Sequence, residues 1–281
     1  MSEKLNPLSK YFRKPTIYVQ IPTGGRFNPE IPKTILDEIP IMPMTAIDEI
    51  SMQNPDALLN GEALMNVIKS CVPSIPDPRE LCNIDADLLF LAIKYATYGK
   101  TITHLHTCSE CEEQAEYNID INNVLEKFPE IDKVDPIEHG DLKIHITPPK
   151  IESMTRLALI DVEQQRILQS IQAVGDNEIT EMELAKQFAI SFRKVSKQNV
   201  DLLINAIDKI ETPDEVVKDK EMIMEFMNNV PATVIKEVND KVELVTKRPE
   251  DLTTFEFACE SCNHKDKIKF EMNTVNFSSA G

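Results

Sequence analysis

The chain has 281 residues, of which 42% are hydrophobic and 27% charged, a composition typical of one large or two smaller globular domains and not of a disordered chain. Its 30 basic and 47 acidic residues give a net charge of −17, which repels nucleic-acid phosphates and offers no polybasic segment to a membrane surface. No apolar run approaches the roughly 20 residues of a membrane span, and no signal peptide is recognisable. We therefore expect a protein of a reducing cytoplasm, in which the six cysteines are core residues, metal ligands or reactive thiols.

Residues 1–44 are predicted to form an extended, proline-rich N-terminal segment with short strands. Seven of the 18 prolines fall within the first 43 residues, and "IYVQIPTGGRF" alternates before it turns at Gly24 and Gly25. Alternation followed by a glycine turn is typical of a short hairpin. A segment of this kind has little core of its own, so it is available to protein partners.

Residues 45–150 are predicted to hold packed helices and the first of two cysteine pairs. Thr45, with Asp48 three positions later, is a helix start signal. The apolar stripe of "LMNVIKSC" predicts an amphipathic helix that turns Cys71 into the core. "DADLLFLAIKYATYG" predicts a buried helix that stops at Gly99 and leads directly into the first cysteine pair. We therefore expect these helices and the cysteine-bearing strands to share one core.

Two C-x-x-C pairs, Cys108 with Cys111 and Cys259 with Cys262, carry the strongest chemical signal of the sequence. Each pair lies between short alternating segments, which predict two hairpins with two thiols at each tip. Zinc takes four tetrahedral ligands, and a C-x-x-C turn points two sulfurs at one ion. The pattern therefore predicts a split zinc ribbon in which all four cysteines bind one structural zinc ion. Such a site is coordinatively closed and does no chemistry.

Other interpretations of these pairs stay open. A thioredoxin-like redox motif would place C-x-x-C at the start of a helix, and neither "EEQAEYN" nor "NHKDKIKF" resembles an amphipathic helix. The pairs could also have lost their metal, or never meet. His104, His106 and His264 lie close enough for a mixed ligand set, but with four thiolates present we expect them at the surface or hydrogen-bonded around the ligands.

Residues 151–248 are predicted to form a helical insertion, a bundle between the two cysteine pairs, after which residues 249–281 supply the second pair and complete the ribbon. Apolar positions recur three and four apart through this region, and in "TPDE" Thr212 is predicted to cap a helix. The methionines of "EMIMEFM" are predicted to fill the core or to form a contact surface. The predicted fold class is α+β. The apolar stripes are Leu157, Ile160, Ile167, Ile171 and Val174; Ala185, Phe188, Ala189 and Phe192; Val200, Leu203, Ile207 and Ile210; and Ile235, Val238, Val242 and Val245.

No catalytic motif is recognisable. The chain contains no G-x-x-x-x-G-K-[ST], G-x-G-x-x-G, G-x-S-x-G or H-E-x-x-H. The carboxylates spread over predicted helix faces, where solvation explains them. The sequence thus gives no support to an enzyme.

Three segments in their order and spacing, "PMTAIDEISMQNPDALLNGEALMNVIKSCV", "DADLLFLAIKYATYGK" and "CSECEEQAEYNIDI", resemble baseplate hub and hub-assembly proteins of T-even-like contractile-tailed bacteriophages. The resemblance covers residues 39–122 well and is looser beyond. It implies a structural or assembly role without enzymatic activity, with other phage baseplate and tail proteins as partners. It also implies a place in the host cytoplasm during assembly, and leaves open whether the chain stays in the virion.

The sequence therefore favours a zinc-stabilised, non-catalytic component of a phage tail baseplate hub. Two hypotheses of other classes stay open. One is a zinc-ribbon adaptor that docks protein partners in a nucleic-acid machine, and the other is a thiol-dependent enzyme.

Overall fold

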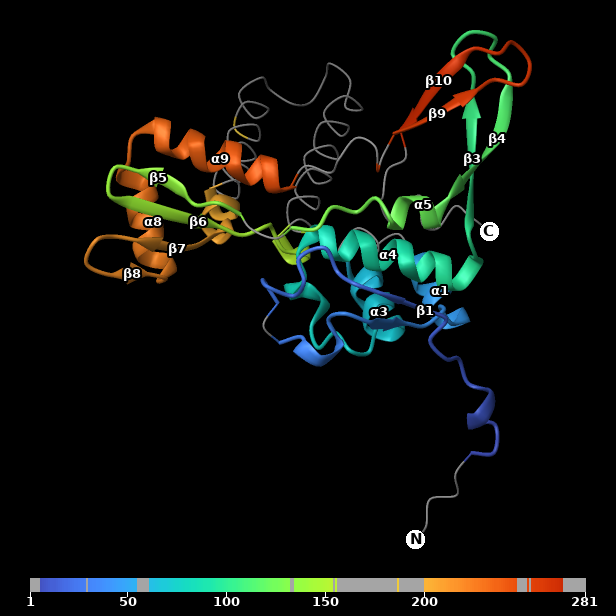
Figure 1. Cartoon of the computed structure of the whole chain (residues 1–281), viewed down its shortest axis with the longest axis horizontal. Coiled ribbons are helices and arrows are strands. Elements are labelled where there is room, and N and C mark those ends of the chain that lie inside the picture. Colours follow the sequence, from blue (N-terminus) through green and yellow to red (C-terminus); the bar gives the residue numbers. More distant parts are fainter. Residues whose placement is uncertain are drawn as a thin grey trace.

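The computed structural model describes residues 6–28, 30–54, 61–131, 134–153, 155, 186, 200–246, 252 and 254–269. Helices and small antiparallel sheets give it an α+β architecture. Figure 1 shows a central body of helices, a separate sheet with its own helices, and two hairpins that project together from the body. Each of these parts has its own cluster of buried apolar side chains. No helix in the described ranges has the length and apolar character needed to cross a membrane.

The N-terminal segment packs into the central body. Strand β1 (Ile17–Val19) pairs antiparallel with β2 (Ile39–Ile41), which confirms short strands in this region. The predicted hairpin at Gly24 and Gly25 is wrong, because the residues after the glycines do not pair with β1. Buried Asp85 instead accepts hydrogen bonds from this loop and holds it against the body. The segment also supplies core side chains, namely Ile21, Ile31, Ile39 and Ile41, so it does have a core.

Helices α1 (Ala46–Met52), α3 (Glu62–Cys71) and α4 (Asn83–Tyr98) form the rest of the central body. The predicted cap of α1 is confirmed as a complete capping box, in which Thr45 and Asp48 bond each other's backbone N–H groups. Helix α4 is buried along most of its length and ends at Gly99, whose φ of 93° lies in the left-handed region that suits glycine. Short 3₁₀ turns η2 (Lys33–Ile35) and η3 (Pro78–Glu80) complete this part, and a third, η1 (Ser9–Tyr11), lies in the exposed segment that precedes it.

Both cysteine pairs lie at the tips of antiparallel hairpins, as predicted. Strands β3 (Thr101–Thr107) and β4 (Gln114–Asp120) form the first, which continues into α5 (Ile121–Leu125). Strands β9 (Thr254–Ala258) and β10 (Lys265–Lys269) form the second. The expected common core is present for α4 but not for α3, which packs in the cluster of the central body. Side chains of α4, both first-hairpin strands and β9 form the shared cluster. Its members include Leu91, Tyr95, Ile102, Ile119, Val124, Leu252, Phe255 and Phe257.

The second body is a four-stranded antiparallel sheet in the order β5 (Ile137–His139), β6 (Leu142–Ile146), β7 (Ile207–Glu211) and β8 (Val216–Val217). Helices α8 (Lys220–Asn229) and α9 (Ala232–Thr246) pack against it. In α9, Val234, Val238 and Val242 are buried at a four-residue spacing. Of the seam predicted for this helix, Val238 and Val242 are buried, and Ile235 and Val245 are partly buried against the same cluster. Of the α8 methionines, Met227 is buried, whereas Met222 and Met224 are exposed.

The predicted helical character of residues 151–248 is wrong for residues 207–217, which form β7 and β8. A β-bulge explains the misleading pattern. Ile146 pairs with Ile207, but the preceding His145 pairs with Lys209, so β7 holds one extra residue at this point. Ile207 and Ile210 consequently both face the core although they lie three positions apart, which is the spacing of a helix face.

Thr212 caps no helix. Its hydroxyl accepts from the backbone N–H groups of Asp214 and Glu215, as a helix cap would, but the chain then returns as β8. The stripe positions predicted between residues 157 and 174 and between residues 185 and 192 lie outside the described residues, and the boundaries of the four predicted segments stay a prediction.

Candidate metal centre

The two cysteine turns have the same local backbone geometry. In each, the first cysteine is buried and the second is exposed. The residue after the second cysteine has a positive φ, 59° at Glu112 and 57° at Asn263. In each turn, the first cysteine also exchanges two backbone hydrogen bonds across the loop. In the first turn, Cys108 N–H donates to Glu113 O at 2.9 Å and Glu112 N–H donates to Cys108 O at 3.1 Å. In the second turn, Cys259 N–H donates to His264 O and Asn263 N–H donates to Cys259 O, both at 2.8 Å.

The structure brings all four predicted cysteines together. Their Sγ atoms all lie within 4.8 Å of one another. The contacts cross between the turns, since Cys108 Sγ lies 3.7 Å from Cys262 Sγ and Cys111 Sγ lies 3.6 Å from Cys259 Sγ. Four sulfurs around one ion at about 2.3 Å would be separated by about 3.8 Å in a tetrahedron. The cluster therefore has the donor atoms and the dimensions of a four-thiolate metal site.

The thiols of the cluster differ in pKa, as expected of ionisable groups that lie close together. The backbone N–H groups of Cys262 and Ser261 lower the pKa of Cys259 to about 6. For Cys111 the Glu113 N–H acts in the same direction, but the Cys262 thiol, followed by desolvation and the other two thiols, outweighs it and raises the pKa to about 12. One thiolate forms readily, and further ionisation beside it is opposed. A bound cation would remove this opposition, so the donor set fits a metal ion.

Asp266 of β10 is a residue of this site that the sequence analysis missed. Its carboxylate accepts a hydrogen bond from the Ser109 N–H at 3.0 Å and lies 3.0 Å from His106 Nε2. The hydrogen bond from His106, followed by that from Ser109, holds the pKa of Asp266 well below its usual range. Asp266 thus links the second hairpin to both the strand and the turn of the first. A lone aspartate in an acidic chain gives no sequence signal of such a role.

His106 lies beside the cysteine cluster. His106 faces Asp266, and its ring stacks edge-on to Tyr117 at 6.2 Å between centroids. Tyr117 in turn lies 4.8 Å from Phe257 of the second hairpin. The metal-like cluster of four cysteines includes no histidine among the residues that the structure describes. The aromatic contact between Tyr117 and Phe257 therefore also joins the two hairpins.

The remaining two cysteines belong to the core. Cys71 is fully buried at the end of α3, and burial raises the pKa of its thiol to about 11. Cys82 is buried at the start of α4, where burial likewise raises its pKa far above the usual range. Both thiols stay protonated at neutral pH, so neither is poised as a nucleophile.

The fold and the site together define a class, an α+β protein in which two hairpins from distant parts of the chain are joined at a cluster of four cysteines. The family described as T4 bacteriophage base plate protein matches residues 14–277, and the chain belongs to this family. Comparison with curated proteins and with solved structures gave no match. The family extends the resemblance found at residues 39–122 over nearly the whole chain. It suggests a structural component of a phage tail, with other tail proteins as its partners.

Proposed function

We propose that the chain is a non-catalytic structural or assembly component of the phage baseplate hub, stabilised by one zinc ion. The observation that carries the proposal is the meeting of Cys111 and Cys259, 148 positions apart, in a cluster of four thiols within a baseplate protein. The ligands are Cys108, Cys111, Cys259 and Cys262.

Zinc suits this donor set better than the hard cations. Thiolates are soft ligands, and Mg²⁺ and Ca²⁺ select oxygen. Four thiolates leave no position for water, so the ion holds the hairpins and activates nothing. The ion holds the hairpin of β9 and β10 against the hairpin of β3 and β4, which follows α4 in the chain. This closure joins the two projecting hairpins of Figure 1 into one rigid unit, as a contact element in an assembly requires.

The charge of the chain favours protein partners. A net charge of −17 opposes contact with DNA phosphates, whereas tail proteins with basic surfaces would be attracted to it. We therefore place the chain in the host cytoplasm while the hub is built and in the tail of the virion if it remains there.

The test is to follow an affinity-tagged chain through phage assembly. Hub intermediates and completed tails are purified from infected cells and analysed by quantitative mass spectrometry. We expect the chain in the hub intermediates in a fixed ratio to other tail proteins, whether or not it persists in completed tails. Its absence from both, or tight DNA binding that weakens steeply with salt, would contradict the proposal. A tagged unrelated phage protein of similar charge controls for nonspecific capture.

A further inference from the structure

The first described residues form an exposed apolar arm. Residues 6–12, called the arm below, are all exposed, and three of them are large and apolar: Leu8 (61% exposed), Tyr11 (74%) and Phe12 (58%). Within the described part of the chain, the backbone hydrogen bonds of the arm stay inside it, through the turn η1. Figure 1 shows the arm leading away from the central body. Clustered exposed aromatic side chains of this kind mark interaction sites.

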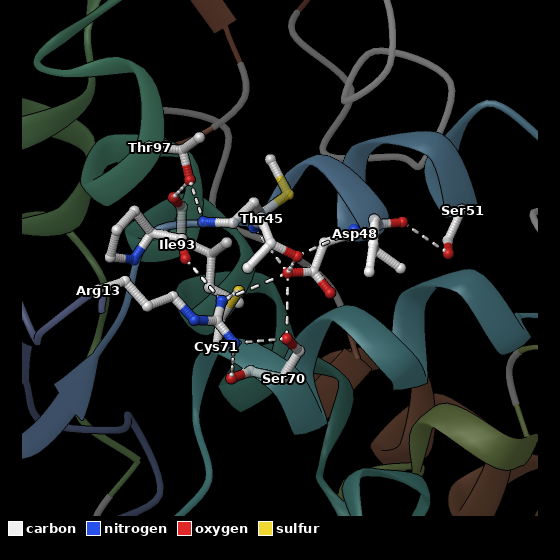
Figure 2. A network of polar contacts seen from close by, with 11 residues as sticks. Arg13, Thr45, Asp48, Ser51, Ser70, Cys71, Ile93 and Thr97 are labelled. Carbon is white, nitrogen blue, oxygen red and sulfur yellow. Dashed lines mark hydrogen bonds and ion pairs between the residues drawn. The ribbon is translucent and has the colours of Figure 1, made fainter. Parts of the chain in front are cut away.

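The root of the arm is fixed to the body by Arg13. Its guanidinium donates to Pro43 O at 2.7 Å, to Ser70 O at 2.8 Å and to Ser70 Oγ at 2.7 Å, and pairs with Asp48 at 3.3 Å. Figure 2 shows Arg13 reaching the end of α3 and the start of α1 at once. Because the next residues then enter β1, the arm leaves the body at a defined place, beside α1.

Helix α1 carries a second exposed apolar surface at this place. Ile47 and Ile50, one helical turn apart, are 76% and 67% exposed. Tyr98, whose hydroxyl donates to Glu49 at 3.1 Å, adds a half-exposed ring from the end of α4. We call Ile47, Ile50 and Tyr98 the α1 patch. Asp48, which lies in the same helix, binds Arg13, so the root of the arm and the patch are neighbours on one end of the molecule.

The N-terminal region that contains the arm differs in charge from the rest of the chain. Residues 4–29 contain five basic residues and no acidic one, so the remainder carries a net charge of −22 against −17 for the whole. Helix α1 has Asp48 and Glu49 in its first turn and no basic residue in its last. The basic region of residues 4–29, in which Lys10 is the basic residue of the arm itself, is thus attracted to the acidic body of another copy. Lys10 lies over the Tyr11 ring at 4.8 Å from its centroid, and together with Lys14 it gives the arm too few cations to bind an anionic membrane or a nucleic acid.

We propose that two copies of this chain exchange arms, so that Leu8, Tyr11 and Phe12 of each copy cover the α1 patch of the other. The arm root lies beside the patch, so a two-fold axis at this end of the molecule satisfies both exchanges at once. The opposite charges of residues 4–29 and of the body favour this approach. The exchange covers two apolar surfaces that a single copy leaves in water.

The test measures the association of the full-length chain by sedimentation velocity from submicromolar to high micromolar concentration. We expect a monomer–dimer equilibrium that weakens as salt rises. The double variant Tyr11→Ala/Phe12→Ala should raise the dissociation constant at least about tenfold, because aromatic anchors carry most of the energy of such contacts. Tyr18→Ala, which removes an equally exposed aromatic ring from β1, is the matched control and should leave it unchanged.

A patch variant, Ile47→Ser/Ile50→Ser, should weaken association as much as the arm variant does. Mixing the two variants should then partly restore it, because a mixed dimer keeps one intact arm and one intact patch that face each other. Leu244→Ser, an exposed apolar residue on α9, controls for a general loss of surface apolarity. A chain that stays monomeric, a dimer that neither variant weakens, or a mixture that associates no better than its components would overturn the proposal. So would binding of the chain to anionic phospholipid vesicles that the arm variant abolishes.

Discussion

The carboxylate of Asp266, in the last described strand, accepts a hydrogen bond from the backbone N–H of Ser109, which lies between the two cysteines of the first pair. The same oxygen faces His106 at 3.0 Å. One side chain of the second hairpin therefore fixes both the turn and a strand of the first. Asp266 therefore helps to hold the two cysteine turns together at the cluster of four sulfurs.

Asp266→Asn should weaken zinc binding about 10- to 100-fold, the usual effect of removing a carboxylate next to the ligands. The amide keeps the size of the side chain but loses the charge that two donors share. Competition with a chromophoric chelator measures the affinity. Glu256→Gln, an exposed carboxylate of the same hairpin that contacts Lys267 at 3.5 Å, is the control and should bind zinc like the wild type. Equal affinities for all three proteins would show that Asp266 does not position the site.

Purified protein should contain about one equivalent of zinc, and Cys259→Ser should lose it together with much of its thermal stability. A neutral hydroxyl cannot replace the thiolate that the turn stabilises. Elemental analysis and thermal melts with and without chelator provide the readout. Ser261→Ala, in the same turn, keeps the backbone N–H groups and should behave like wild type. Metal-free protein whose melting temperature ignores both the chelator and the cysteine substitution would refute the zinc assignment.

Local signals in the sequence were sufficient for parts of this fold. The capped start of α1 at Thr45 and the end of α4 at Gly99 depend on residues a few positions apart, and both were predicted. The cysteine hairpins were predicted for the same reason, because alternation and a C-x-x-C turn are local. Asp266 gives no signal in the sequence because its partners lie 157 and 160 positions away, a relationship that only the meeting of the two hairpins creates.

Non-local pairing also explains the errors. The sequence predicts a helix at β7 because the bulge gives Ile207 and Ile210 a helical spacing, and β6, its partner, lies far upstream. The sequence predicts a hairpin at the glycine turn after β1 because the competing hydrogen bonds to Asp85 come from another element. In both cases tertiary contacts overrode a valid local preference.

Helix α8 offers a matched test of its packing against the sheet. Ile223 is fully buried there, whereas its neighbour Met222 is 60% exposed. Ile223→Ala should lower the free energy of unfolding by about 2–5 kcal/mol, because the vacated volume cannot be refilled. Met222→Ala should change it by less than about 0.5 kcal/mol. Urea denaturation measures both. Similar losses for the two variants would mean that α8 does not rest on the sheet through Ile223.

The pH dependence of stability should report the buried carboxyl of Asp85. It is 0% exposed and accepts from the Thr23 N–H at 3.0 Å, from the Thr23 hydroxyl at 2.6 Å and from the Asn28 amide at 3.2 Å. Burial raises its pKa to about 6, although these hydrogen bonds act in the opposite direction. In the unfolded chain the pKa is about 3.9. Between these two values the folded state holds the proton more tightly, so the contribution of Asp85 to stability is complete below about pH 4 and is lost as the pH rises through about 6.

Asp85→Asn removes this titration. The variant loses part of the hydrogen bonding to Thr23, so its stability at low pH should be below that of wild type. As the pH rises from about 4 to 7 the wild type should lose on the order of 3 kcal/mol relative to the variant, which corresponds to a shift of about two pKa units. Urea denaturation at several pH values measures the difference between the two free energies of unfolding. Asp214→Asn, an exposed aspartate in the turn after β7, should give a difference from wild type that does not change with pH in this way. If the curves of wild type and Asp85→Asn run parallel, the carboxyl is not a buried group with a raised pKa, and its hydrogen bonds to the N-terminal loop fully offset its burial.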